Sequence, residues 1–247
     1  MKIARISLES GPRFAQIDPG SGNYRVLAGD PLYQGVAYTG QVFSAADVRP
    51  VSPVLPRSKV VVFDSGDAPC GAGENSMYLK PNTSVTGPDT PLILPSWGSE
   101  FTCRPMLAAI ISRPCKEIPA DMVAQAVYGY TLVNLITAVE YAGRDPYRAF
   151  GFDTSCASGP ALETELEPGE YEITLAVDGE VDTQICRYGF SRVQQAVSAA
   201  STVATLLPAD LVTVCALHAP VPVSAGTDLA VDFAPLGVLR NPVVADR

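Results

Sequence analysis

The sequence contains little lysine and lacks long hydrophobic runs, and both shortages restrict what the protein can be. Only four lysines are spread over the 247 residues, and the formal net charge is −9 at pH 7. A protein that binds nucleic acid through its phosphates needs clustered Lys and Arg, so no nucleic-acid partner is expected. The apolar runs are interrupted well before the roughly 18 residues that a membrane span requires, so no membrane partner is expected either.

The cysteines also lack the patterns that would indicate a secreted or metal-binding chain. None of the six forms a CxxC pair, and the N-terminus MKIARISLES has no apolar signal region. A chain of this length buries enough surface to fold without disulfides. These features predict a reducing, cytoplasmic location.

Short apolar runs separated by proline and glycine dominate the rest of the sequence. The 22 prolines and 20 glycines are spread evenly, which favours strands over long amphipathic helices. Helices are predicted over Ala120–Ala126 and over Val193–Leu206, where apolar residues recur at helical spacing. The predicted fold class is α+β, mainly β. The predicted strands are Lys2–Leu8, Val60–Phe63, Leu107–Ile111, Tyr171–Val177, Leu211–Ala216 and Leu229–Phe233.

Two further patterns indicate a hairpin and a domain boundary. In YEITLAVDGEVD, alternating apolar residues precede Asp178-Gly179, a pair that favours a type I′ β-hairpin turn. Residues 45–57, AADVRPVSPVLPR, carry three prolines between apolar stretches and are typical of a linker. We therefore predict a small N-terminal domain with its linker over residues 1–54 and a larger domain over residues 55–247.

Residues 128–140, YGYTLVNLITAVE, form an apolar helix or strand that carries Asn134, Thr137 and Glu140. Two interpretations are open at this point. The stretch is either plain core or the remains of a reaction centre whose chemistry has changed.

A series of stretches covers nearly the whole chain in a recognisable order. They are MKIARI…GPRFA, DVRPVSPVLPRSKVVVF, MYLKPNTSVTGPDTPLILP, LAAIISRPCKEIPADMVAQAVYGYTLVNLITAVE, GFDTSCASGP, AVDGEV, LLPADLVTV and LGVLRNPVV. Their order and spacing resemble the fumarylacetoacetate hydrolase family. The resemblance implies a small N-terminal domain followed by a mixed β-sandwich roll with few helices, often assembled as a homodimer.

The resemblance also implies where a metal site would lie. Members of the family bind a divalent metal through a glutamate-x-glutamate pair and a later aspartate. Those positions are occupied here by Arg104, Met106 and Leu135, and a lysine of the family pattern falls at Phe150. Mg²⁺ requires anionic oxygen ligands, and a permanent guanidinium cation repels it. We therefore predict no metal and no other cofactor.

Arg104 is the central candidate for catalysis. A guanidinium has five planar donors and holds a carboxylate, a 1,3-dicarbonyl or its enolate in a bidentate grip, so Arg104 is expected to replace the metal as the electrophile. Met106, Leu135 and Phe150 are expected to line an apolar pocket around it, which favours larger, polyketide-like substrates. For Met106 and Leu135, the alternative to lining a pocket is simple packing in the core.

For Arg104 the alternative is an ion pair with Glu100 or Glu140. Glu140 is also a candidate acid or base beside Arg104, together with Glu74 in the lid-like stretch DSGDAPCGAGE and the single histidine, His218. Plain solvation for Glu74 and chance placement for His218 are the alternatives. The remaining candidates for substrate binding, chosen from the family pattern and the lid stretch, are Cys70, Tyr78, Lys80, Tyr130, Thr137 and Asp153.

Two functions of different classes follow. The first is a metal-independent enzyme that acts on an enolisable carbonyl or dicarbonyl substrate by isomerisation, cyclisation or carbon–carbon bond chemistry, in natural-product biosynthesis. The second is a pseudoenzyme that keeps the scaffold as a binding or assembly partner. A deep pocket with an inward Arg104 favours the first, and a cavity filled by side chains favours the second.

Overall fold

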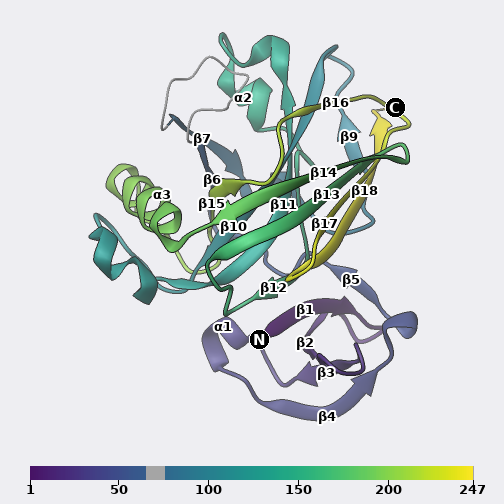
Figure 1. Ribbon diagram of the computed structural model, residues 1–247, viewed down its shortest axis with the longest axis vertical. Coiled ribbons are helices and arrows are strands. Elements are labelled where there is room, and N and C mark those ends of the chain that lie inside the picture. The colour runs from purple at the N-terminus through teal and green to yellow at the C-terminus, as the bar shows by residue number, and fades with distance from the viewer. Residues whose placement is uncertain (65–75, 247) are drawn as a thin grey trace.

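The computed structural model describes residues 1–64 and 76–246. Within these residues, thirteen strands form one large sheet and five strands form a second, smaller sheet. The ribbon in Figure 1 shows β1 to β4 gathered at one end of the molecule with β5 beside them, and most of the other strands and the long helix toward the other end. The protein is mainly β with few helices, as predicted.

The bounds of the elements follow the chain order. The strands are β1 (Lys2–Ser7), β2 (Arg13–Ile17), β3 (Tyr24–Leu27), β4 (Tyr38–Phe43), β5 (Arg49–Val51), β6 (Lys59–Asp64), β7 (Ser76–Pro81), β8 (Val85–Thr86), β9 (Leu92–Leu94), β10 (Phe101–Ile111), β11 (Val127–Ala138), β12 (Cys156–Glu163), β13 (Gly169–Val177), β14 (Glu180–Tyr188), β15 (Leu211–Ala216), β16 (Val221–Val223), β17 (Asp228–Phe233) and β18 (Gly237–Ala245). The α-helices are α1 (Pro31–Gln34), α2 (Pro146–Phe150) and α3 (Phe190–Val203).

The N-terminal strands continue the large sheet. Strand β1 pairs with β2 on one side and with β12 on the other, where Ile3 lies opposite Leu162. The predicted linker, residues 45–57, contains a short 3₁₀ helix and strand β5, which pairs with β1. Backbone hydrogen bonds therefore connect the first 54 residues to the remainder of the chain.

Most of the ambiguous stretch at residues 128–140 lies in a strand, and its last two residues, Val139 and Glu140, begin a 3₁₀ helix. Strand β11 pairs with β10 along almost its full length, and buried residues occupy nearly every position because apolar clusters cover both faces. At Gly129, a Cβ atom would lie 2.6 Å from the carbonyl oxygen of Glu163, so the close approach of β12 requires glycine. Strands β11 and β12 form the centre of the large sheet.

The predicted hairpin is confirmed. Strands β13 and β14 pair from Gly169–Tyr188 to Val177–Glu180, and the turn residues Asp178 and Gly179 both have positive φ, as a type I′ turn requires. The inward residues of β13, Ile173 and Leu175, belong to the cluster that fills the space between the two sheets. The smaller sheet therefore packs against the centre of the larger one (Figure 1).

One helix prediction is confirmed and the other is wrong in type. Helix α3 covers Phe190–Val203 and buries Val193 and Val197 against β15 and β6. Residues Ala120–Gln125 form a 3₁₀ helix instead of an α-helix. The amide of Ala126 bonds to the carbonyl of Val123, and the Ala126 carbonyl accepts from Ser112 on the other side of the turn, so the segment ends before an α-helical turn can develop. None of the helices in the described residues is long and apolar enough to span a bilayer.

Candidate functional site

A cavity of about 550 Å³ lies between β14 and the segment that follows β15. Arg104, in the middle of β10, is one of its walls and is only 7% exposed. Arg192, at the exposed first turn of α3, and Arg187, at the end of β14, are the other arginines. The remaining described lining residues are Gln184, Ile185, Cys186, Cys215, Ala216, Leu217, His218 and Ala219.

The charged side chains among the described residues that line the cavity are all arginines. Arg104 and Arg192 carry positive charge into the cavity, and no carboxylate is among the described residues that line it. The guanidinium of Arg187 is already paired, since its Nε donates a hydrogen bond to a carboxylate oxygen of Glu170 at 2.6 Å. Because a partly buried guanidinium is poorly screened by solvent, the cavity favours an anionic ligand.

His218 lies in the same wall and is held by three neighbours. Its Nδ1 is 2.8 Å from the Ala219 carbonyl oxygen, and its Nε2 is 2.8 Å from Asp182 Oδ2 and 3.1 Å from Gln184 Nε2. Both ring nitrogens thus have an oxygen partner, a carbonyl at Nδ1 and a carboxylate at Nε2. Asp182 is therefore an orienting partner that the sequence did not reveal.

The carboxyl group of Asp182 is kept ionised by this arrangement. Hydrogen bonds from His218 and then from Gln184 lower the pKa of Asp182 below its ordinary value. The stabilisation that follows is present above the ordinary carboxyl pKa and is lost as the pH falls through the lowered value. At neutral pH, the carboxylate of Asp182 is therefore ionised beside His218.

Met106 and Leu135 lie on the core side of β10 and β11. They are 2% and 1% exposed, and they pack in one apolar cluster with residues of β6 and β15. The structure does not bring them to the wall of the Arg104 cavity. Their surroundings match the alternative interpretation, in which both side chains simply pack in the core.

The metal that the family resemblance implies does not fit these residues. A guanidinium, a thioether and an alkyl side chain stand at Arg104, Met106 and Leu135, and none of them offers the oxygen that Mg²⁺ requires. Elsewhere in residues 1–64 and 76–246, no three His, Cys, Asp or Glu side chains come together as a metal-binding group. We therefore assign no step to a metal.

Lys80, Phe150 and Tyr78 form a separate group where β7 contacts α2. The ammonium of Lys80 is fully buried and donates to the carbonyls of Ile136 and Phe150, each at 2.8 Å, and to Ser155 Oγ at 3.0 Å. The Tyr78 and Phe150 rings stack with centroids 3.9 Å apart. This geometry uses the three protons of Lys80 to fasten β7 to β11 and α2, a structural role that differs from the predicted contact with a ligand.

The remaining predicted residues that the structure describes are not among those that line the cavity. Glu140 accepts hydrogen bonds from the backbone amides of Ser99 and Glu100, both at 2.8 Å, and so closes the turn before β10. Asp153 is exposed, Thr137 is buried in β11, and Tyr130 packs edge-on against Tyr188. Cys70 and Glu74 lie outside the described residues.

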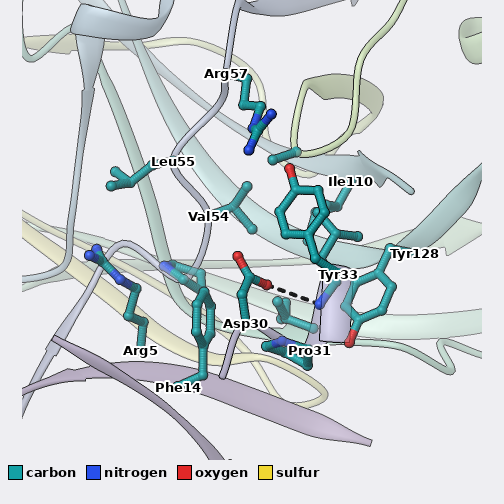
Figure 2. A pocket seen from close by; sticks show the side chains of 14 residues that line it. Arg5, Phe14, Asp30, Pro31, Tyr33, Val54, Leu55, Arg57, Ile110 and Tyr128 are labelled. Carbon is teal, nitrogen blue, oxygen red and sulfur yellow. Dashed lines mark hydrogen bonds between the residues drawn. The ribbon is translucent and has the colours of Figure 1, made fainter. Parts of the chain in front are cut away.

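A second cavity, of about 230 Å³, lies where β1, β2, α1 and residues 53–57 meet the part of the large sheet formed by β10, β11 and β12. Figure 2 shows Asp30 in the middle of its lining, with one oxygen bonded to the amide of Leu32 at 2.9 Å, where it caps α1. Arg57 covers the Tyr33 ring, and burial, followed by the charge of Asp30, raises the pKa of Tyr128 to about 12. The one carboxylate among the described lining residues is thus engaged and the phenol of Tyr128 stays protonated, so the Arg104 cavity is the better candidate for proton chemistry.

The two packed sheets and the short strands at the N-terminus define a mixed β-roll protein with a small N-terminal unit. A family model described as fumarylacetoacetate (FAA) hydrolase C-terminal matches residues 59–244, and one described as Rv2993c-like, N-terminal matches residues 1–53. The chain belongs to the fumarylacetoacetate hydrolase family.

Several relatives resemble the chain over much or all of its length. Protein Rv2993c of Mycobacterium tuberculosis is 32% identical in an alignment 267 residues long, gaps included, that covers 99% of this chain and 98% of that protein. The crystal structure of 5-carboxymethyl-2-hydroxymuconate delta-isomerase from Mycobacterium smegmatis has a TM-score of 0.87 and 32% identity, with 100% of both chains covered. The mitochondrial oxaloacetate tautomerase Fahd2a of Rattus norvegicus is 26% identical over 68% of this chain and 58% of its own. These relatives support an isomerase-type function in general terms.

Proposed function

We propose that the protein is a metal-independent enzyme that catalyses acid–base chemistry of the isomerase or tautomerase type on an enolisable 2-oxo acid. The observation that carries the proposal is the cavity itself, which is open and has Arg104 in its wall. A scaffold that served only for binding or assembly would be free to fill this space with side chains. The relatives named as an isomerase and a tautomerase support the type of reaction.

In this proposal, Arg104 binds the oxygen on which charge develops. Loss of a proton from carbon leaves an enolate, and charge-assisted hydrogen bonds from a guanidinium stabilise that oxyanion more than the ground-state carbonyl. Arg192, nearer the mouth, attracts the carboxylate of the substrate. The two arginines thus divide binding and electrophilic work between them.

His218 is proposed to move the proton. Its ring is fixed by the Ala219 carbonyl at Nδ1 and by the Asp182 carboxylate at Nε2. In the transfer, the Nε2–H of a protonated ring exchanges its hydrogen bond with Asp182 for a contact with the substrate carbon and delivers its proton there. The enol oxygen loses its own proton to water, and the ring is reprotonated from water. Cyclisation or carbon–carbon bond formation would begin from the same enolate.

The described lining changes the expected substrate. An apolar pocket built from Met106 and Leu135 would have favoured apolar substrates, whereas the charged residues described in the lining of the Arg104 cavity are cationic. We therefore propose a substrate with one or two carboxylates in place of a polyketide-like one. A role in natural-product biosynthesis and assembly as a homodimer stay predictions.

Assays with a small panel of enolisable compounds test this choice. We expect the protein to accelerate ketonisation of the oxaloacetate enol, with kcat/KM at least about 10-fold above that for acetylacetone, because a charge-assisted hydrogen bond contributes about 1.5–3 kcal/mol. The measurement is the decay of enol absorbance, corrected for the uncatalysed rate. Equal rates for both compounds would contradict the anionic specificity, and oxaloacetate binding without any turnover in the panel would favour the pseudoenzyme.

A further inference from the structure

Two cysteines from different sheets meet in the wall of the Arg104 cavity. Cys186 lies on β14 of the smaller sheet and Cys215 lies on β15 of the larger one, and their Sγ atoms are 3.4 Å apart. They are 8% and 3% exposed, and both line the cavity, which is their route to solvent. They are 29 residues apart in the chain. Packing of the two sheets therefore creates a dithiol that spans the sandwich.

The surroundings make the two sulfurs unequal. The hydrogen bond with Cys186 lowers the pKa of Cys215 to about 7, with burial opposing the shift and with Arg192 and then Arg104 adding to it. The same hydrogen bond, followed by burial, raises the pKa of Cys186. Cys215 is thus the nucleophilic thiolate near neutral pH, and Cys186 is the thiol beside it.

The other buried cysteines differ in both respects. Cys103 and Cys156 are fully buried, and burial raises the pKa of both thiols, that of Cys156 to about 12. Neither is in the described lining of the cavity. They serve as internal controls because they are expected to stay reduced.

We propose that Cys186 and Cys215 form a reversible disulfide when a hydroperoxide enters the cavity. The Cys215 thiolate attacks one oxygen of hydrogen peroxide, the O–O bond breaks, and a sulfenic acid forms while hydroxide leaves and is protonated to water. Cys186 then loses its proton, attacks the Cys215 sulfur and expels the second oxygen as water. Two thiols are oxidised, one peroxide is reduced, and two water molecules are released. An external thiol reverses the reaction by exchange.

The bond would change the cavity directly. It would join β14 to β15 and enclose α3 in the linked loop. Gln184, two residues before Cys186, contacts His218, three residues after Cys215. Oxidation would therefore fix the wall that carries His218 to the wall that carries Asp182, and in the oxidised state it would remove the thiolate next to Arg104.

Peptide mapping of the wild-type protein tests the proposal without any activity assay, so its outcome is independent of the proposed function. The folded protein is treated with a small excess of hydrogen peroxide, alkylated with iodoacetamide and digested. We expect a linked pair of peptides carrying Cys186 and Cys215, which dithiothreitol separates, while Cys103 and Cys156 remain reduced. We also expect the midpoint of thermal unfolding to rise by about 5–10 °C on oxidation.

The variants sharpen the test. Cys186→Ser and Cys215→Ser should each abolish the linked pair and the thermal shift, and Cys115→Ser, which alters a cysteine of another cavity, should keep both. The proposal is overturned if Cys186 and Cys215 of the folded wild-type protein are both alkylated after peroxide treatment. Irreversible oxidation of Cys215 beyond the sulfenic acid, with Cys186 still a thiol, would also overturn it.

Discussion

Replacing Arg104 by glutamine is expected to lower kcat/KM for ketonisation of oxaloacetate by about 10²–10³-fold. That loss is typical when a preorganised donor to an oxyanion is removed from a site with little solvent. Glutamine keeps a hydrogen-bond donor and much of the size of the side chain, but it has no charge. The decrease should appear mainly in kcat, because the guanidinium contacts the enolate more strongly than the ketone.

The matched control is Arg113→Gln. Arg113 lies in another cavity, where its Nη2 donates to Gln125 at 2.8 Å, so kcat/KM should stay within about twofold of wild type, as for substitutions away from the chemistry. Thermal unfolding of both variants separates lost chemistry from lost structure. If the folded Arg104→Gln protein keeps full activity, then Arg104 is not the electrophile.

Replacing Lys80 by methionine is expected to reduce the free energy of unfolding by about 4 kcal/mol. Methionine resembles lysine in length but removes the donor shared by the carbonyls of Ile136 and Phe150 and the Ser155 hydroxyl. The Phe150 carbonyl keeps a bond from Ser155, and each buried group that loses its partner costs about 1–3 kcal/mol. Relief from burying a charge offsets part of the sum. Urea denaturation of both proteins at neutral pH measures the difference.

Lys116→Met provides the comparison for Lys80. The Lys116 ammonium is also bonded to a carbonyl, that of Thr202, but the side chain is exposed, so the expected change is within about 0.5 kcal/mol. A Lys80→Met protein with wild-type stability and a greatly raised KM would show instead that Lys80 binds the ligand, as the sequence suggested.

Local patterns in the sequence were sufficient for most of the fold. The hairpin turn at Asp178-Gly179 is encoded by two adjacent residues, and α3 by apolar residues at helical spacing, so neither depends on distant contacts. The 3₁₀ helix that begins at Ala120 could not be predicted because its end is set by a hydrogen bond from Ser112, across the turn. Strand β11 was ambiguous because a strand buried on both faces loses its alternation.

The site was less predictable, for a physical reason. Arg104 was visible because a cation stands where the family pattern has an acid. The partner of His218 is Asp182, which comes from a strand of the other sheet, 36 residues away, and is brought there only by packing. Once the hairpin was recognised, strand alternation would have put Asp182, Gln184 and Cys186 on one face, but it could not have named Cys215 as their neighbour.

Lys80 shows the opposite failure. A lysine in a strand is ordinarily expected at the surface or beside an anion, and the sequence offered no sign that three oxygen acceptors from β11, α2 and the segment before β12 would surround it. Met106 and Leu135 similarly took their surroundings from the packing of β10 and β11 against β6 and β15. Tertiary contacts decide such cases.

The central claim is that Arg104, and not a divalent metal, stabilises the enolate. Its most direct test is the kcat/KM of protein that has been dialysed against a chelator, verified as metal-free, and assayed with and without added Mn²⁺ against the same non-enzymatic background. We predict equal kcat/KM, within about twofold, in both assays. Activity that disappears on chelation and returns with Mn²⁺ would contradict the account.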